Sequence, residues 1–135
     1  MTAQEMISQI QMVPYLENGR DLNGLDCFGL IEIWHREVLG IEIDDRIEQP
    51  SEPEGFEQGY LSQKDWVAVT EPENNAVAVM KALWNGSTHE YGHCGMIYEG
   101  RVYHFKPDHG FQHAPIDDRQ LRITKIMKHS QCKQS

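Results

Sequence analysis

Three residues of this chain, Cys27, His93 and His104, have the side chains that nucleophilic catalysis by a thiol requires. A thiol is weakly ionised at neutral pH, so it needs a base or a nearby positive charge to become a useful nucleophile. One histidine can supply both, and a second polar group then fixes its tautomer and orientation. These residue types indicate a cysteine hydrolase, provided that the fold brings the three side chains together.

Cys27 lies at the start of a predicted amphipathic helix. Apolar residues continue from it with the spacing of one helical face: Leu30, Ile31, Trp34 and Val38. Asp26 is a good N-cap, and Gly40 is a good C-terminal stop. The pattern therefore places Cys27 in the first helical turn. There the helix dipole favours a thiolate, and the backbone N–H of Cys27 can stabilise an oxyanion.

The two histidines lie on a predicted β-hairpin. Its strands cover residues 92–98 and 101–105, and residues 99–100 (Glu-Gly) fit a two-residue turn. With that turn, the numbers of facing residues sum to 199. The register of the hairpin is therefore fixed by the sequence, and it can be used to ask which side chains meet.

Six residues of the hairpin share one face, because side chains alternate along a strand: His93, Gly95, Ile97, Val102, His104 and Lys106. His93 and His104 are then diagonal neighbours, roughly 5–8 Å apart at their Cβ atoms. Gly95 faces His104 and leaves space beside it. We expect one imidazole to hydrogen-bond the other.

The remaining thiols and one histidine are interpreted as structural or surface residues. Cys94 points away from the face of His93, which predicts a core residue, and Cys132 lies in a polar tail. His35 follows Cys27 by eight residues, roughly 12 Å along the helix axis, which is too far to assist it. A lone buried cysteine is usually a small core residue, so a purely structural Cys27 stays open at this point.

Three histidines fall in predicted loops: His89, His109 and His113. A zinc site built from His89, His93 and His104 is a weaker alternative, because their spacing resembles no known zinc scaffold. We expect no cofactor and no metal.

The order of the predicted elements, with helices first and an antiparallel sheet after them, indicates the α+β class. A short helix is expected over 3–13 and a loop over 15–24, with further strands over 66–69, 76–83 and 121–127. The 135 residues suit one domain, with a flexible tail over 128–135.

The net charge of −9 is concentrated in one segment. Residues 41–62 are acidic and rich in proline and glycine, which predicts a surface loop, either a lid or a docking surface. An acidic chain of this kind argues against nucleic acid as a partner, and no long apolar run predicts membrane insertion. Three cysteines without a CxxC motif do not form a disulfide framework.

Two segments and one tyrosine resemble NlpC-type cysteine peptidases. Residues 24–30 (GLDCFGL), with Tyr15 twelve positions before the cysteine, resemble the nucleophile region, and residues 93–104 resemble the histidine hairpin. The resemblance implies a papain-like α+β fold that cuts peptidoglycan stem peptides between D-γ-glutamate and a diamino acid. It implies Cys27 as nucleophile, His93 as base, His104 as third polar residue and Tyr15 as a helper of the oxyanion or substrate.

Some features depart from the family pattern. Phe28 replaces a small serine and is expected to narrow the pocket beside the nucleophile, while the acidic segment 41–62 has no counterpart. The aromatic residue directly after the cysteine resembles the pattern of the phage tail-associated branch of the family, whose members often carry an aromatic residue there. The first six residues lack a secretory signal, and no wall-binding repeat is present.

The likeness to the tail branch implies a setting. The chain is expected in the virion tail, made in the host cytoplasm and acting in the periplasm or cell wall during genome delivery. Its expected partners are the peptidoglycan stem peptide and other tail proteins, such as the hub and the distal tail protein. The alternatives are a structural tail-tip protein with an idle site, or an interbacterial peptidoglycan amidase effector.

Overall fold

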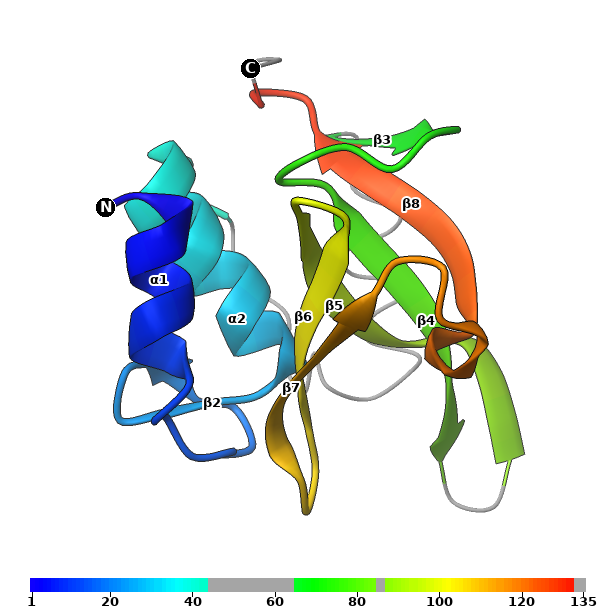
Figure 1. Cartoon of the computed structure of the whole chain (residues 1–135), viewed down its shortest axis with the longest axis horizontal. Helices are drawn as coiled ribbons and strands as arrows, with labels where there is room; N and C mark the ends of the chain where they lie inside the picture. The colour runs from blue at the N-terminus through cyan, green and yellow to red at the C-terminus, as the bar shows by residue number, and fades with distance from the viewer. Residues whose placement is uncertain (44–64, 85–86, 133–135) are drawn as a thin grey trace.

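Two helices pack on one face of a six-stranded antiparallel sheet, so the predicted α+β arrangement is confirmed (Figure 1). The computed structural model describes residues 1–43, 65–84 and 87–132. The helices are α1 (Ala3–Ile10) and α2 (Cys27–Trp34), and α2 continues into the π-helical turn η1 (His35–Leu39). None of the helices in the described ranges is long and apolar enough to cross a membrane.

The strands of the sheet lie in the order β3-β8-β4-β5-β6-β7. Their bounds are β3 (Trp66–Val69), β4 (Val77–Trp84), β5 (Ser87–Tyr98), β6 (Arg101–Lys106), β7 (Gly110–Pro115) and β8 (Ile123–His129). Every pairing within the sheet is antiparallel. The strands predicted over 66–69, 76–83, 92–98, 101–105 and 121–127 are all present, with bounds that are shifted or extended. β5 begins at Ser87, so His89 lies on a strand and its assignment to a loop was wrong.

One strand of the six-stranded sheet was not predicted. β7 pairs with β6 over six residues, from Lys106↔Gly110 to Arg101↔Pro115, so His113 lies on a strand and the loop assignment was wrong. A short edge strand that begins with glycine and ends with proline lacks the apolar alternation by which strands are recognised.

The chain before α2 is ordered by short-range hydrogen bonds. Thr2 and Glu5 form a capping box at the start of α1, which ends at Ile10, three residues earlier than predicted. Part of the predicted loop over 15–24 forms a small hairpin of β1 (Arg20–Asp21) and β2 (Gly24–Leu25).

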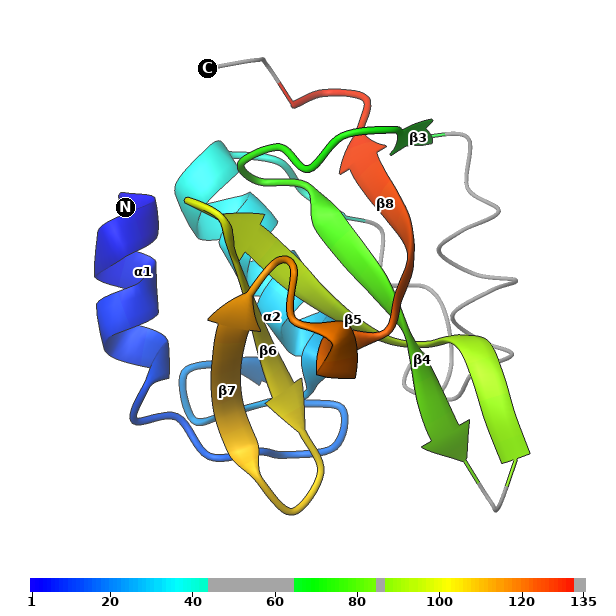
Figure 2. The ribbon, with the colours of Figure 1, turned by 45° about the vertical axis from the view of Figure 1, so that its right-hand side comes forward.

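The N-cap and stop predicted for the second helix are confirmed. The Asp26 carboxylate accepts from the Gly29 N–H, and Gly40 ends η1 in the left-handed conformation with φ of 70°. The prediction that only one face of this helix is buried is wrong, since all eight residues of α2 are buried. The sheet covers one side of the helix, while α1 and the β1–β2 hairpin lie along others (Figure 2).

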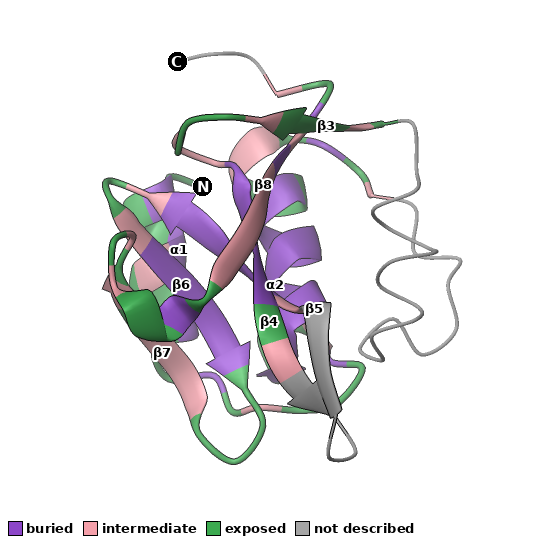
Figure 3. Cartoon of the chain, turned by 90° about the vertical axis from the view of Figure 1, so that its right-hand side faces the viewer, coloured by how far each residue is buried: buried purple, intermediate pink, exposed green. Residues whose placement is uncertain are grey.

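The sheet carries apolar residues on both faces. The larger cluster lies between helices and sheet and includes Trp34, Val79 and Phe105. The smaller cluster lies on the opposite face, where η3 (Arg119–Leu121) and the chain after β7 cover Met80 and Val102. Figure 3 shows that burial is greatest in α2 and the middle strands. Strands buried on both faces hold the histidine hairpin in a fixed position.

The chain end differs from the expected flexible tail. Lys128 and His129 belong to β8, where Lys128 Nζ pairs with Glu73 Oε2 at 2.9 Å and His129 is buried. The polar residues of this segment do not indicate that it pairs with β3 along the edge of the sheet. Most of the acidic segment 41–62 lies outside the described residues; of its described part, Ile41 is buried.

Candidate active site

The β5–β6 hairpin brings the two predicted histidines together. Its register pairs Met96 with Tyr103 and Ile97 with Val102, as the two-residue turn predicts. His93 Nε2 lies 2.9 Å from His104 Nδ1, and the rings meet edge to face with centroids 5.1 Å apart. The expected contact between the imidazoles is therefore present.

Gly95 provides the space that this pair needs. A Cβ added at Gly95 would lie 2.7 Å from the carbonyl oxygen of Tyr103 and 3.0 Å from the Cβ of His104. Both are backbone or near-backbone atoms of β6, so they cannot move aside without disturbing the strand pairing. A larger residue would push β6 and its histidine away from His93.

The four residues singled out from the sequence line one cavity of about 660 Å³: Tyr15, Cys27, His93 and His104. Cys27 is 6 % exposed, and it reaches this cavity from the first turn of α2. Residues far apart in the chain thus meet around one thiol. This is the arrangement that thiol-based nucleophilic catalysis requires.

The surroundings of Cys27 favour its thiolate. They lower the pKa of Cys27 from an ordinary value of 9.0 to about 6. The largest cause is the neighbouring Cys94 thiol, followed by burial, which acts in the opposite direction, and then by the hydrogen bond and charge of His93. The thiolate is therefore favoured at neutral pH.

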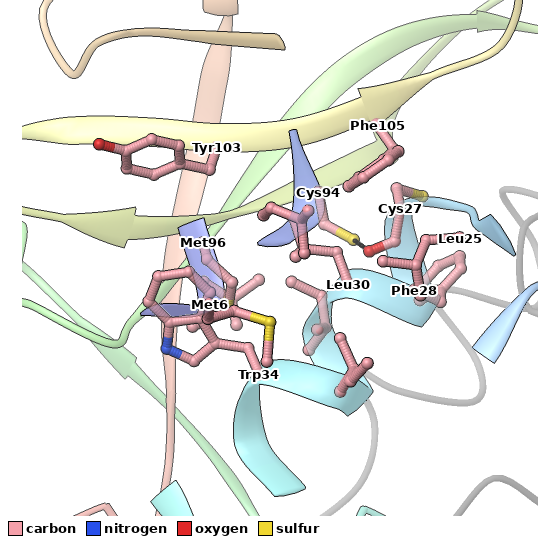
Figure 4. Packing of buried hydrophobic residues seen from close by; sticks show 14 of the residues in the cluster. Met6, Leu25, Cys27, Phe28, Leu30, Trp34, Cys94, Met96, Tyr103 and Phe105 are labelled. Atoms are coloured by element: carbon pink, nitrogen blue, oxygen red, sulfur yellow. Dashed lines mark hydrogen bonds between the residues drawn. The ribbon is translucent and has the colours of Figure 1, made fainter. Parts of the chain in front are cut away.

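Cys94 lies in the core, as the alternation of β5 predicts, but it also contacts the nucleophile. Its Sγ donates to the carbonyl oxygen of Cys27 at 3.6 Å (Figure 4). Burial raises the pKa of Cys94 well above its ordinary value, so this thiol stays protonated and acts as a donor. The sequence could not reveal the contact, because it depends on how α2 docks on the sheet.

The contact between the histidines sets their chemical roles. Burial, and then the positive charges of His93 and Lys106, lower the pKa of His104 to about 3, so this ring is neutral. A neutral His104 can accept a hydrogen bond at Nδ1 from His93 Nε2–H. His93 then presents Nδ1 to Cys27, with which it hydrogen-bonds. The pair can therefore take and return one proton at Cys27.

Tyr15 is placed beside the nucleophile by a short bridge with Leu25. Burial, and then the neighbouring charges of Cys27 and Asp26, raise the pKa of Tyr15 well above its ordinary value. Its hydroxyl therefore keeps its proton and can donate a hydrogen bond into the cavity.

A buried ion-pair network holds the start of α2. The fully buried Asp26 carboxylate accepts from the N–H groups of Gly29 and Asn18, each at 2.8 Å, and pairs with Arg20 Nη1 at 2.8 Å. Arg20 Nε also pairs with Glu32 Oε2 at 2.8 Å, nearly two turns further along the helix. Sequence reasoning identified the cap but not Arg20 or Glu32, whose positions depend on the β1–β2 hairpin.

The other predicted residues lie elsewhere. His35 is buried beside Trp66, with ring centroids 5.4 Å apart, and lies away from the cavity as expected. Phe28 is buried in the larger core cluster and does not line the cavity, so it does not narrow it as predicted. Within the described ranges no three His, Cys, Asp or Glu side chains are grouped to hold a metal, and the His89 side chain lies outside the described atoms.

Comparison with known proteins supports the fold. No family model matches the sequence, and no curated protein shows significant similarity to it. Among solved structures, the chain is similar to the NlpC/p60 domain of the peptidoglycan hydrolase SagA, with a TM-score of 0.59 and 15 % identity over 93 % of this chain and 97 % of that domain. The chain therefore has the papain-like α+β fold of NlpC/p60 domains.

Proposed function

We propose that this chain is a cysteine peptidase that cleaves peptidoglycan stem peptides between D-γ-glutamate and the diamino acid. The observation that carries the proposal is the low-pKa Cys27 thiol in one cavity with the hydrogen-bonded pair His93 and His104. The substrate class is supported by the fold, which is that of a domain from a peptidoglycan hydrolase. Fold alone does not assign a substrate, so the residues must carry the chemistry.

The reaction follows from the positions of the side chains. The Cys27 thiolate attacks the acyl carbon, and the resulting oxyanion accepts hydrogen bonds from the Cys27 N–H and the Tyr15 hydroxyl. Protonated His93 gives its proton to the leaving amine, which departs and leaves a thioester on Cys27. His93 then takes a proton from water, which attacks the thioester carbon. The C–S bond breaks, the peptide leaves as a carboxylic acid, and the Cys27 thiolate and protonated His93 are restored.

Digestion of purified sacculi tests this proposal. The full chain should release fragments that mass spectrometry identifies as cut at one bond of the stem peptide, whereas Cys27→Ala should release none. Cys132→Ser is the matched control, since it removes a thiol that does not line the cavity and should keep full activity. Equal release by wild type and Cys27→Ala would contradict the proposal.

We further propose that the peptidase works in a phage tail tip, beside the hub and distal tail proteins, where it opens the wall during genome delivery. The support is the resemblance of Phe28, directly after the nucleophile, to tail-associated members. Virions that carry Cys27→Ala should assemble normally and infect poorly. Normal infection by these virions would favour a structural tail protein with an idle site, and absence of the chain from virions would favour a delivered effector.

A further inference from the structure

The cavity around Cys27 is cationic, although the chain has a net charge of −9. Lys81, Lys106 and Arg122 all line it, and the described residues that form its wall include no aspartate or glutamate. All three residues are exposed. A concave surface lined with one sign of charge concentrates ligands of the opposite sign.

Three separate segments supply these cations. Lys81 lies in β4, Lys106 ends β6, and Arg122 connects η3 to β8. Only Lys106 could be expected from the sequence, because alternation places it on the face of His104. Convergence of three segments on one cavity distinguishes this cluster from a run of surface lysines.

The backbone is irregular where two of these residues meet. The β4–β5 register shifts between Met80 and Ala82, so Lys81 stands at a bulge, and its N–H bonds the Arg122 carbonyl at 3.0 Å. Bulges often redirect a side chain next to a functional site. Lys81 lies at this irregular stretch and is among the residues that line the cavity.

Arg122 has a conformation that is costly for a residue with a side chain. Its φ of 53° and ψ of 49° lie in the left-handed region. The conformation is held by the bond from Lys81 and by the Arg122 N–H, which donates to the Arg119 carbonyl. Such strain persists where the surroundings fix it, and it is frequent at ligand-binding positions.

We propose that Lys106 and Arg122 form a carboxylate subsite that selects stem peptides with a free carboxylate close to the scissile amide. This inference rests on the proposed function and adds the residues that determine specificity. Stem peptides can present that group on the γ-linked D-glutamate or on the diamino acid, and amidation at either position removes its charge. The subsite therefore favours the free acid over the amide at one of these two positions.

Alkylation of Cys27 tests the subsite without any substrate. Iodoacetate and iodoacetamide react at the same sulfur but differ in charge, so the ratio of their rates measures the potential in the cavity. The assay uses Cys132→Ser protein at pH 8.5, where Cys27 is fully ionised, in low salt. Removing each cation in Lys106→Gln and Arg122→Gln should lower the ratio roughly two-fold, and 1 M salt should reduce the difference.

Arg119→Gln is the matched control, since it removes one exposed positive charge near the cavity but outside its lining. It should leave the ratio close to that of wild type. An unchanged ratio in the double variant Lys106→Gln with Arg122→Gln would overturn the proposal.

Synthetic stem peptides identify which carboxylate is bound. One peptide is free at both positions, one is amidated at glutamate and one at the diamino acid. Wild type should show a raised KM for one amidated peptide only, and the double variant should treat it like the free acid. Equal KM values for all three in wild type would refute the selection. Failure to cleave any peptide would refute the proposed function, while the alkylation ratio would still decide the charge of the subsite.

Discussion

The contact between Cys94 and Cys27 makes a quantitative prediction. In wild type the pKa of Cys27 is about 6, against an ordinary value of 9.0, a difference equivalent to about 4 kcal/mol in favour of the thiolate. The neighbouring Cys94 thiol is the largest single cause. Its hydrogen bond to the Cys27 carbonyl oxygen holds it beside the nucleophile. Replacing Cys94 by alanine should therefore raise the pKa of Cys27.

The midpoint of a pH profile is the correct readout. At pH 6 a rise in pKa from about 6 to about 7 lowers the ionised fraction of Cys27 roughly five-fold. The more basic thiolate is also intrinsically about three-fold more nucleophilic, so the rate at pH 6 falls only about two-fold. The midpoint of the pH profile reports the pKa of Cys27 directly, because the higher nucleophilicity of the thiolate changes the height of the profile and not its midpoint.

The assay is alkylation by iodoacetamide between pH 4.5 and 9.5 in a Cys132→Ser background, with the modified peptide identified by mass spectrometry. Wild type should give a midpoint near pH 6, and Cys94→Ala a higher one. Cys94→Ser, which keeps a donor, should stay closer to wild type. A wild-type midpoint near pH 8.5, no change in Cys94→Ala, or faster labelling of Cys94 than of Cys27 would refute this reasoning.

Three further outcomes are expected. His104→Gln should keep most peptidase activity, because a glutamine oxygen can still accept from His93, whereas His93→Ala should lose nearly all of it; equal losses in a kcat comparison would contradict these roles. Gly29→Ala should lower the free energy of unfolding in urea by more than about 2 kcal/mol, because the added Cβ collides with the carbonyl oxygen of Gly19; an unchanged midpoint would contradict the close approach. Burial lowers the pKa of His35 to about 4, so the unfolded chain binds a proton that the folded chain does not between pH 6.5 and 4. Stability should be full above pH 6.5 and fall below it by about 1.4 kcal/mol per pH unit from this group, a slope that urea titrations should not find in His35→Leu.

Features that depend on neighbouring residues could be predicted from the sequence. The Asp26 cap acts within one helical turn, and the two-residue turn after Tyr98 fixes the register that joins His93 to His104. Both rest on local geometry, which the spacing of residue types records directly.

Features that depend on docking could not be predicted. β7 forms because β6 offers it an edge, and the Cys94 thiol contacts Cys27 because α2 lies on that face of β5. Arg122 lines the cavity and has a left-handed backbone conformation. No glycine or asparagine at this position indicates that conformation in the sequence. Such contacts are set by long-range packing, which periodicity in one chain does not encode.

β5 places His93 and Cys94 side by side, with the base on one face and the thiol that supports the nucleophile on the other. Successive side chains of a strand alternate, so a shift of one residue moves each to the opposite side of the sheet. A single-residue insertion between the β5–β6 turn and His93 would therefore move His93 and Cys94 to the opposite faces and remove both contacts. An insertion of two residues would restore the faces but shift His93 along β5, out of register with His104. Homologous chains with an intact site should therefore keep the number of residues between the hairpin turn and the histidine unchanged.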